Sequence, residues 1–179
     1  MKLWLVRHAT PLIARGVCYG RLDIEADHAD TQACAASLAA ALPPGLPVKV
    51  SSLRRARQLA QALSALRGDL PIQVDKRLAE MDFGQWEGVP WRDIPEDAVE
   101  RWTNDFAHHR FGGAESASEV LQRAARALEE MSGLEEAAWI THAGVIRAVR
   151  YLVEHGTEPT ASAWPRQAPG FGAWATLTV

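Results

Sequence analysis

Short apolar runs alternate with amphipathic segments along most of this chain, and this alternation limits the fold more than any other feature. We interpret the apolar runs as strands at residues 3–6, 47–50, 71–74, 137–140 and 173–179. Between most of them, apolar residues recur at helical spacing, which predicts helices at residues 30–42, 53–68, 120–131 and 145–153. Such alternation is typical of α/β proteins, whose ligands bind at the carboxyl ends of the strands. We therefore expect a three-layer α/β/α sandwich with a mostly parallel central sheet.

Local signals support the positions of these elements. The sequence Pro-Pro-Gly at residues 43–45 directly follows the first proposed helix and is a strong stop signal. Either Ser116 or Ser118 has a side-chain oxygen suited to cap the helix at residues 120–131. Because residues 3–6 are apolar throughout, we expect this strand near the middle of the sheet.

Residues 83–111 interrupt the alternation with a concentration of aromatic rings. The six rings in this segment are Phe83, Trp86, Trp91, Trp102, Phe106 and Phe111. They are expected either to form a small satellite core or to provide a wall or lid for a substrate. A length of 179 residues suits one substantial core, so we predict a single domain over residues 1–179 with an aromatic-rich insertion at about 83–111.

Composition argues against several kinds of partner. Lysine and arginine total 19 against 22 acidic residues, so the chain lacks the basic surplus of a nucleic-acid-binding protein. The longest apolar stretch, residues 33–42, is interrupted by Ser37 and is too short to cross a membrane. The apolar run at the N-terminus ends at Arg7, which is too early for a signal peptide. We therefore expect a cytoplasmic protein with no nucleic-acid or membrane partner.

No resident metal or cofactor is expected. Cys18 and Cys34 have no cysteine or histidine partners at zinc-ligand spacing, and we expect both thiols to be reduced. The adjacent His108 and His109 do not form a metal site, since neighbouring side chains seldom converge on one ion. The chain also contains no Walker motif and no glycine fingerprint for a dinucleotide.

Two strands lead directly into histidines. His8 follows the first strand closely, and His142 follows the fourth. If these strands are parallel and central, the two imidazoles face each other at the top of the sheet. A helix begins after His142, so the amides of Ala143 and Gly144 are suited to bind an anion at its N-terminus.

Cations and carboxylates near these strand ends complete a plausible phosphate pocket. The candidate cations are Arg7 and the cluster Arg54, Arg55 and Arg57, among which periodicity does not choose. The candidate acids are Glu80, Asp82 and Glu87. A neutral imidazole can attack phosphorus and leave again in a second step, while arginines bind the phosphoryl oxygens. A carboxylic acid then protonates the leaving alkoxide, and this chemistry requires no metal.

Five segments together resemble the histidine phosphatase superfamily, which includes the phosphoglycerate mutases. They agree with the family in order and spacing, and they are residues 5–10, 51–58, 80–88, 113–116 and 142–147. The resemblance runs from about residue 3 to residue 150. It implies a phosphoglycerate mutase-like fold and an enzyme that forms a phosphohistidine intermediate without a metal.

The resemblance also assigns roles to residues of this chain. It makes His8 the nucleophile, Glu80 the proton donor and His142 the residue that holds and polarises the phosphoryl group. It selects Arg55 as the phosphate ligand of its cluster, since this arginine precedes the alanine of the family pattern. With Arg7, these residues would form the base of the pocket, while the other two arginines of the cluster are expected to be solvated.

Several positions depart from the family pattern. Ala9 and Ala143 stand where glycine is usual, which leaves their backbone donors in place if φ stays negative. Thr10 stands where the family often has an acidic residue, and its hydroxyl can still bind phosphate. Ala14 stands where the family has asparagine, and its side chain cannot form a hydrogen bond with phosphate.

Three further residues are expected at the substrate entrance, and they are Tyr19, Arg21 and Trp86. For Arg21 two roles remain open: binding a second acidic group of the substrate, or forming a salt bridge with Asp23 or Glu25.

Residues 83–88 with Trp91, and the short chain, are most similar to the α-ribazole phosphatase branch of cobalamin biosynthesis. We therefore expect a phosphomonoester hydrolase that acts on a small phosphorylated metabolite, with α-ribazole 5′-phosphate as the first candidate. The alternatives are a phosphoglycerate mutase-type phosphoryl transferase and, from another class, an inactive module that binds a phosphorylated ligand. The sequence leaves open whether the protein forms a homodimer.

Overall fold

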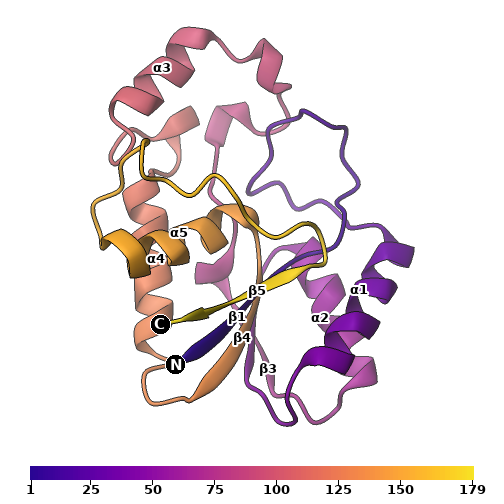
Figure 1. Ribbon diagram of the computed structural model, residues 1–179. Helices are drawn as coiled ribbons and strands as arrows, with labels where there is room; N and C mark the ends of the chain where they lie inside the picture. Colours follow the sequence, from indigo (N-terminus) through magenta and orange to yellow (C-terminus); the bar gives the residue numbers. More distant parts are fainter.

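A single five-stranded sheet organises the computed structural model, which describes all of residues 1–179 (Figure 1). The strand order is β3-β2-β4-β1-β5. The strands are β1 (Lys2–Arg7), β2 (Val48–Ser51), β3 (Ile72–Asp75), β4 (Glu136–Thr141) and β5 (Trp174–Thr178). Every neighbouring pair is parallel except β1 and β5, which run antiparallel. This confirms the mostly parallel α/β sheet expected from the sequence.

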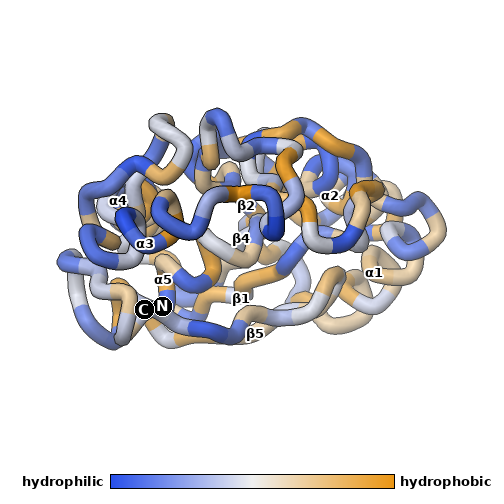
Figure 2. The backbone as a smooth tube through the Cα atoms, turned by 90° about the horizontal axis from the view of Figure 1, so that it is seen from above, coloured by the Kyte–Doolittle hydropathy of each residue, from blue (hydrophilic) through white to orange (hydrophobic).

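Helices cover both faces of the sheet, as Figures 1 and 2 show from two directions. On one face lie α1 (His28–Ala41) and α2 (Arg54–Leu66), and on the other lie α4 (Ala117–Glu129) and α5 (Ala143–His155). Each pair packs its apolar side onto the strands, and the two resulting clusters of buried residues form the core. A further helix, α3 (Glu96–Asn104), stands apart from these layers (Figure 1).

The order of the strands confirms that β1 lies near the middle of the sheet. The middle strand is β4, whereas β1 lies between β4 and the edge strand β5. The interiors of β1 and β4 are both buried, so apolar composition alone does not distinguish the central strand from its neighbour. The strand at the C-terminus takes the edge position, where it covers β1.

Capping chemistry determines where α4 begins. The side chain of Ser116 accepts a hydrogen bond from the amide of Glu119, whose carboxylate accepts one from the amide of Ser116. This capping box starts the helix at Ala117, three residues earlier than the sequence periodicity suggested. The hydroxyl of Ser118 is buried and has no hydrogen-bond partner.

The aromatic-rich segment forms a satellite core. Phe111 is fully buried at its centre, with Trp102 stacked 4.5 Å and Trp91 stacked 5.8 Å from its ring. Cys18, from a distant part of the chain, is buried in the same cluster. Burial raises the pKa of this thiol to about 12, so it remains protonated and unreactive. Both cysteines are free.

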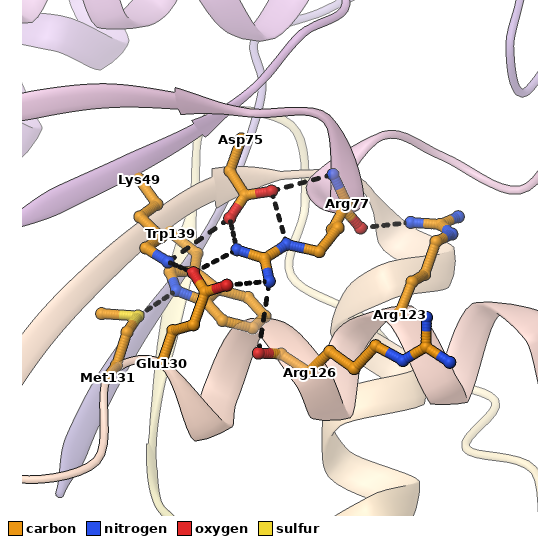
Figure 3. A network of polar contacts seen from close by, with 8 residues as sticks. All are labelled: Lys49, Asp75, Arg77, Arg123, Arg126, Glu130, Met131 and Trp139. Atoms are coloured by element: carbon orange, nitrogen blue, oxygen red, sulfur yellow. Dashed lines mark hydrogen bonds and ion pairs between the residues drawn. The ribbon is translucent and has the colours of Figure 1, made fainter.

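A polar network links β3 to α4 and holds the segment that leads to Glu80 (Figure 3). The guanidinium of Arg77 lies between two carboxylates, with its Nε 2.9 Å from Asp75 and its Nη1 2.6 Å from Glu130. Lys49 on β2 contacts the same two carboxylates. One residue beyond Arg77, the carbonyl of Leu78 accepts a 2.7 Å hydrogen bond from the hydroxyl of β4 Thr141. The chain is thereby fastened to the end of β4 just before Glu80.

None of the helices combines the length and the apolar character needed to span a membrane.

Candidate active site

The ends of two adjacent parallel strands bring a pair of histidines together. Arg7 and Thr141 are paired in register at the ends of β1 and β4, and His8 and His142 are the next residues. The amide of His8 donates to the carbonyl of Thr141 at 3.1 Å. The imidazole centroids lie 5.0 Å apart, and the two residues are only 2% and 0% exposed. The two strand ends therefore bring the imidazoles together as expected, with their planes tilted by 54°.

The contacts of His8 identify its protonation state. Its Nδ1 lies 2.7 Å from the carbonyl oxygen of Ala9, which only accepts, so Nδ1 carries the proton. Its Nε2 lies 3.2 Å from Nε of Arg55, which only donates, so Nε2 holds a lone pair. Burial, followed by the charge of Arg55, lowers the pKa of His8 to about 3. His8 is thus neutral at pH 7 and has a nucleophilic nitrogen.

His142 is buried more completely and has one unused ring nitrogen. Its Nε2 forms a 2.7 Å hydrogen bond with the hydroxyl of Ser51, at the end of β2. Its Nδ1 is buried and has no partner in the protein. Burial, together with the neighbouring His8 and Arg55, lowers the pKa of His142 well below its usual value.

Of the three clustered arginines, only Arg55 is buried at the site. Its two terminal nitrogens donate to the carbonyls of Leu22 and Gly20, each at 2.7 Å, and its Nε faces His8. Arg54 is exposed and forms a salt bridge with Glu25, and Arg57 is exposed as well. The first turn of α2 therefore directs a single cation inward.

Arg7 is held by the segment before β5, a contact that no sequence signal indicated. Its Nη1 donates to the carbonyl of Pro169 at 3.1 Å, and its guanidinium carbon lies 3.9 Å from the centre of the Phe171 ring. The ring of Phe171 is also 5.6 Å from that of His8. Burial lowers the pKa of Arg7, although a guanidinium stays charged at any pH of interest.

Only one of the three candidate acids borders this site. The carboxylate of Glu80 accepts hydrogen bonds from the amides of Met81 and Gly144, both at 2.9 Å. A Cβ atom at Gly144 would come within 2.2 Å of this carboxylate, so a larger residue there would displace Glu80. The amide of Gly144 therefore binds Glu80, which corrects the expectation that it is free for an anion. Ala143 keeps its place at the first turn of α5 beside the cavity.

The other two acids have roles in the local fold. Asp82 accepts from the amide of Gly84 at 2.9 Å. Glu87 binds a set of backbone amides from two segments, namely those of Gly20, Arg21, Leu22 and Phe83. Glu87 thus shapes the loop whose carbonyls hold Arg55.

A cavity of about 280 Å³ borders His8. Its polar lining comes from Arg7, His8, Glu80 and Arg147. Six aromatic residues also line it, and they are Tyr19, Phe83, Trp91, Trp102, Phe106 and Trp164. The segment at residues 83–111 therefore supplies both a satellite core and a wall of the cavity. Sequence reasoning missed Arg147, which ends the matched segment at residues 142–147 but was assigned no role there. It also missed Trp164, which lies in a region without a recognisable motif.

Five residues expected at the site lie outside this lining. Two of them, Arg55 and His142, are fully buried and contact His8. The other three are Thr10, Trp86 and Arg21. The amide of Thr10 donates to Asp30 at 2.7 Å, and its side chain is exposed. Trp86 packs 6.1 Å from Phe111 in the satellite core. Arg21 is half-buried, and its amide is bound by Glu87.

The salt bridge considered for Arg21 is absent, because the two carboxylates interact with another residue. The amide of Arg54 donates to Asp23, and the Arg54 guanidinium pairs with Glu25.

The two alanines that replace family glycines fit their backbone positions. All positive φ angles in the chain belong to glycines, so Ala9 and Ala143 are unstrained. Ala9 is also fully buried, and its carbonyl is the partner of His8 Nδ1. The side chains of the chain form no cluster of three or more histidine, cysteine, aspartate or glutamate residues that suits a metal ion.

Comparison with known proteins agrees with this geometry. The family model of the histidine phosphatase superfamily (branch 1) matches residues 3–169. An adenosylcobalamin/alpha-ribazole phosphatase of Escherichia coli K12 is 28% identical over 167 residues, which cover 82% of this chain and 75% of that protein. A glucosyl-3-phosphoglycerate phosphatase of Mycolicibacterium vanbaalenii is 32% identical over 160 residues, covering 87% of this chain and 69% of that protein.

Solved structures extend the agreement to the fold. The crystal structure of TTHB049 from Thermus thermophilus has a TM-score of 0.75 at 32% identity. The match covers 99% of this chain and 94% of that one. The phosphoglycerate mutase-like fold implied by the sequence resemblance is confirmed. With its paired strand-end histidines and a family match over residues 3–169, this chain belongs to the histidine phosphatase superfamily, branch 1.

Proposed function

We propose that this protein is a phosphomonoester hydrolase that transfers the phosphoryl group of its substrate to His8 and then to water. The observation that carries the proposal is the state of His8: a buried, neutral imidazole whose Nε2 lone pair lies beside Arg55 at the base of the cavity. The phosphatases among the relatives support hydrolase activity.

In the first step, His8 Nε2 attacks phosphorus and the bond from phosphorus to the ester oxygen breaks. Arg7, Arg55 and His142 bind the phosphoryl oxygens, and the guanidinium charges balance the negative charge in the transition state. Arg55 Nε must release His8 Nε2 for this attack, and a phosphoryl oxygen becomes its new acceptor. Glu80 in its acid form donates a proton to the leaving alkoxide.

In the second step, water attacks the phosphohistidine and the phosphorus–nitrogen bond breaks. The carboxylate of Glu80 takes the proton from this water, which restores its acid form. The lone pair returns to His8 Nε2 and inorganic phosphate leaves. The residues of the chain supply every proton and charge that these steps require, so we propose that turnover is independent of a metal.

The lining of the cavity supports a small substrate with a flat, apolar portion. Six aromatic rings border the space beyond the phosphate-binding residues. Such rings favour stacking with a planar group. We propose α-ribazole 5′-phosphate as the first substrate to test, because it carries a planar benzimidazole and a relative from Escherichia coli is an adenosylcobalamin/alpha-ribazole phosphatase.

The deciding experiment measures phosphate release from α-ribazole 5′-phosphate and a panel of phosphorylated metabolites. We expect release by the wild-type protein with a chelator present, inhibition by vanadate, and no turnover by His8→Ala. Isomerisation of a phosphoglycerate without net phosphate release would instead indicate a mutase. Phosphate binding without turnover of any substrate would indicate an inactive binding module. Activity lost on chelation and restored by a divalent cation would contradict metal independence.

A further inference from the structure

A strap formed by residues 169–173 crosses the carboxyl end of β1. The amide of Gly172 donates to the carbonyls of Arg7 and His8, at 3.1 and 2.9 Å, and the amide of Arg7 donates to the carbonyl of Ala173 at 3.0 Å. Gly172 has a φ of +68°, and a Cβ atom there would lie 1.8 Å from the sulfur of Cys34. Only glycine fits this position, so the strap has one well-defined path over the two residues that begin the site.

This path places one aromatic ring against both Arg7 and His8. The ring of Phe171 lies 3.9 Å from the guanidinium carbon of Arg7 and 5.6 Å from the His8 ring. Phe171 is 38% exposed and belongs to none of the buried clusters. Its side chain therefore contributes little to the core, and its main contacts are with residues of the site.

The ring suits the electrostatic situation of Arg7. This guanidinium is partly buried and forms no salt bridge, and the charged or titratable groups near it are Tyr19, Glu80 and Arg147. An aromatic face attracts a cation through its quadrupole. Unlike a carboxylate, it leaves the N–H groups at the edge of the guanidinium free to donate. Pro169 occupies one of these donors, at 3.1 Å, and fixes the rotation of the group.

We propose that Phe171 is a positioning residue that holds Arg7 ready to bind the phosphoryl group. The ring sets the plane of the guanidinium and the Pro169 carbonyl sets its rotation, on a residue that lines the cavity. Holding the cation in advance reduces the entropy lost when phosphate binds. The effect on catalysis rests on the phosphohydrolase function proposed above. The position of Arg7 should also affect the binding of inorganic phosphate, which can be measured without any catalysis.

The test compares Phe171→Leu, which removes the aromatic face, with Phe171→Tyr, which keeps it. Leu66→Ala is a matched control, since Leu66 is an exposed apolar residue at the far end of α2. Steady-state kinetics gives KM and kcat, and calorimetry gives the dissociation constant of inorganic phosphate. Thermal unfolding checks that each variant is folded.

For Phe171→Leu we expect KM and the phosphate dissociation constant to rise by about three- to tenfold, the range of one cation–π contact. We expect a smaller change in kcat, and values within about twofold of wild type for Phe171→Tyr and Leu66→Ala. In an Arg7→Ala background, replacing Phe171 by leucine should have no further effect on phosphate affinity, because the ring acts through that cation.

Wild-type phosphate affinity in Phe171→Leu, or an undiminished effect of the leucine in the Arg7→Ala background, would overturn the proposal. A failure of the proposed function gives a different result. In that case the wild-type protein hydrolyses no phosphomonoester, but if it binds inorganic phosphate, calorimetry still compares the Phe171 variants. Wild-type protein that binds no phosphate at all would overturn both.

Discussion

At the scale of single residues, the contact between Arg55 and His8 keeps the imidazole neutral and also occupies its lone pair. Arg55 donates to His8 Nε2 at 3.2 Å and helps to lower the pKa of His8 to about 3. The imidazole therefore stays neutral, which nucleophilic attack requires, but its lone pair is engaged until substrate arrives. The same arginine is a ligand for the phosphoryl oxygens in the mechanism proposed above. In that mechanism, Arg55 releases His8 Nε2 when it binds the phosphoryl group of the substrate.

This state of His8 is directly measurable. Nitrogen chemical shifts of protein labelled with ¹⁵N in histidine should show His8 as a neutral ring protonated at Nδ1 at pH 7. Because its pKa is lowered to about 3, the same pattern should persist at pH 5. His8→Gln identifies the resonance. A protonated ring at pH 5, or a proton on Nε2 at pH 7, would show that the local electrostatics differ from those described.

The sequence identified the histidines because each follows an apolar strand, but it did not separate the arginines by physical reasoning alone. Arg54, Arg55 and Arg57 occupy one helical turn, and their burial depends on where the loop at residues 19–22 lies. The family resemblance selected Arg55, and the structure supplies the reason. Phe171 lies in no matched segment, and Arg147 ends the segment at residues 142–147 without a role being expected for it, so only the folded chain shows that both border the site.

At the scale of elements, regular segments were predictable and irregular ones were not. The helices α1, α2, α4 and α5 have repeating apolar or small residues, and each lies within a few residues of its expected range. The helix α3 was not predicted, since its nine residues lie in a segment dominated by aromatic residues, glycine and proline. The strap and the loop at residues 19–22 depend on distant hydrogen bonds, which a local pattern does not reveal.

The loop at residues 19–22 should depend strongly on Glu87. Glu87→Ala removes a carboxylate that binds four backbone amides. We expect the free energy of unfolding to fall by about 2 kcal/mol, since several partly buried donors lose their partner at once. KM should rise as well, because the carbonyls of Gly20 and Leu22 hold Arg55. Urea unfolding and steady-state kinetics check both effects.

The neighbouring exposed residue provides the control for this loop. Gln85→Ala should leave stability and KM near their wild-type values. A Glu87→Ala protein with wild-type stability would mean that the loop does not depend on this carboxylate.

The start of α4 offers a matched pair of substitutions. Ser116→Ala breaks the capping box and should lower the free energy of unfolding by about 1 kcal/mol. Ser118→Ala removes a buried hydroxyl that has no partner, so it should be neutral or stabilising. Thermal unfolding compares the two variants. Equal destabilisation by both would show that the cap does not determine the stability of this helix.

At the scale of the whole molecule, the buried histidines link stability to pH. An unfolded histidine takes up a proton near pH 6.5, whereas folded His8 remains neutral down to about pH 3. Between these values the unfolded state binds more protons, so stability decreases as the pH falls. His142, whose pKa is also lowered by burial, acts in the same direction. Keeping the two imidazoles neutral therefore lowers the stability of the whole fold in acid.

This linkage predicts the effect of acid on unfolding. His8 alone should reduce the free energy of unfolding by about 2 kcal/mol between pH 7 and pH 5. His8→Gln should abolish that part of the decrease, whatever its stability at pH 7. Urea unfolding of both proteins at the two pH values makes the comparison. An equal decrease in wild type and variant would mean that folded His8 titrates normally.

The central claim is that the phosphoryl group is transferred to His8. The most direct measurement is rapid quenching of the wild-type protein with substrate during the first turnover, followed by mass spectrometry of its peptides under alkaline conditions, where phosphohistidine survives. We expect the phosphate on His8, formed before the steady state and absent from His8→Ala. Rapid turnover with no phosphorylated protein, or phosphate on another residue, would contradict the mechanism.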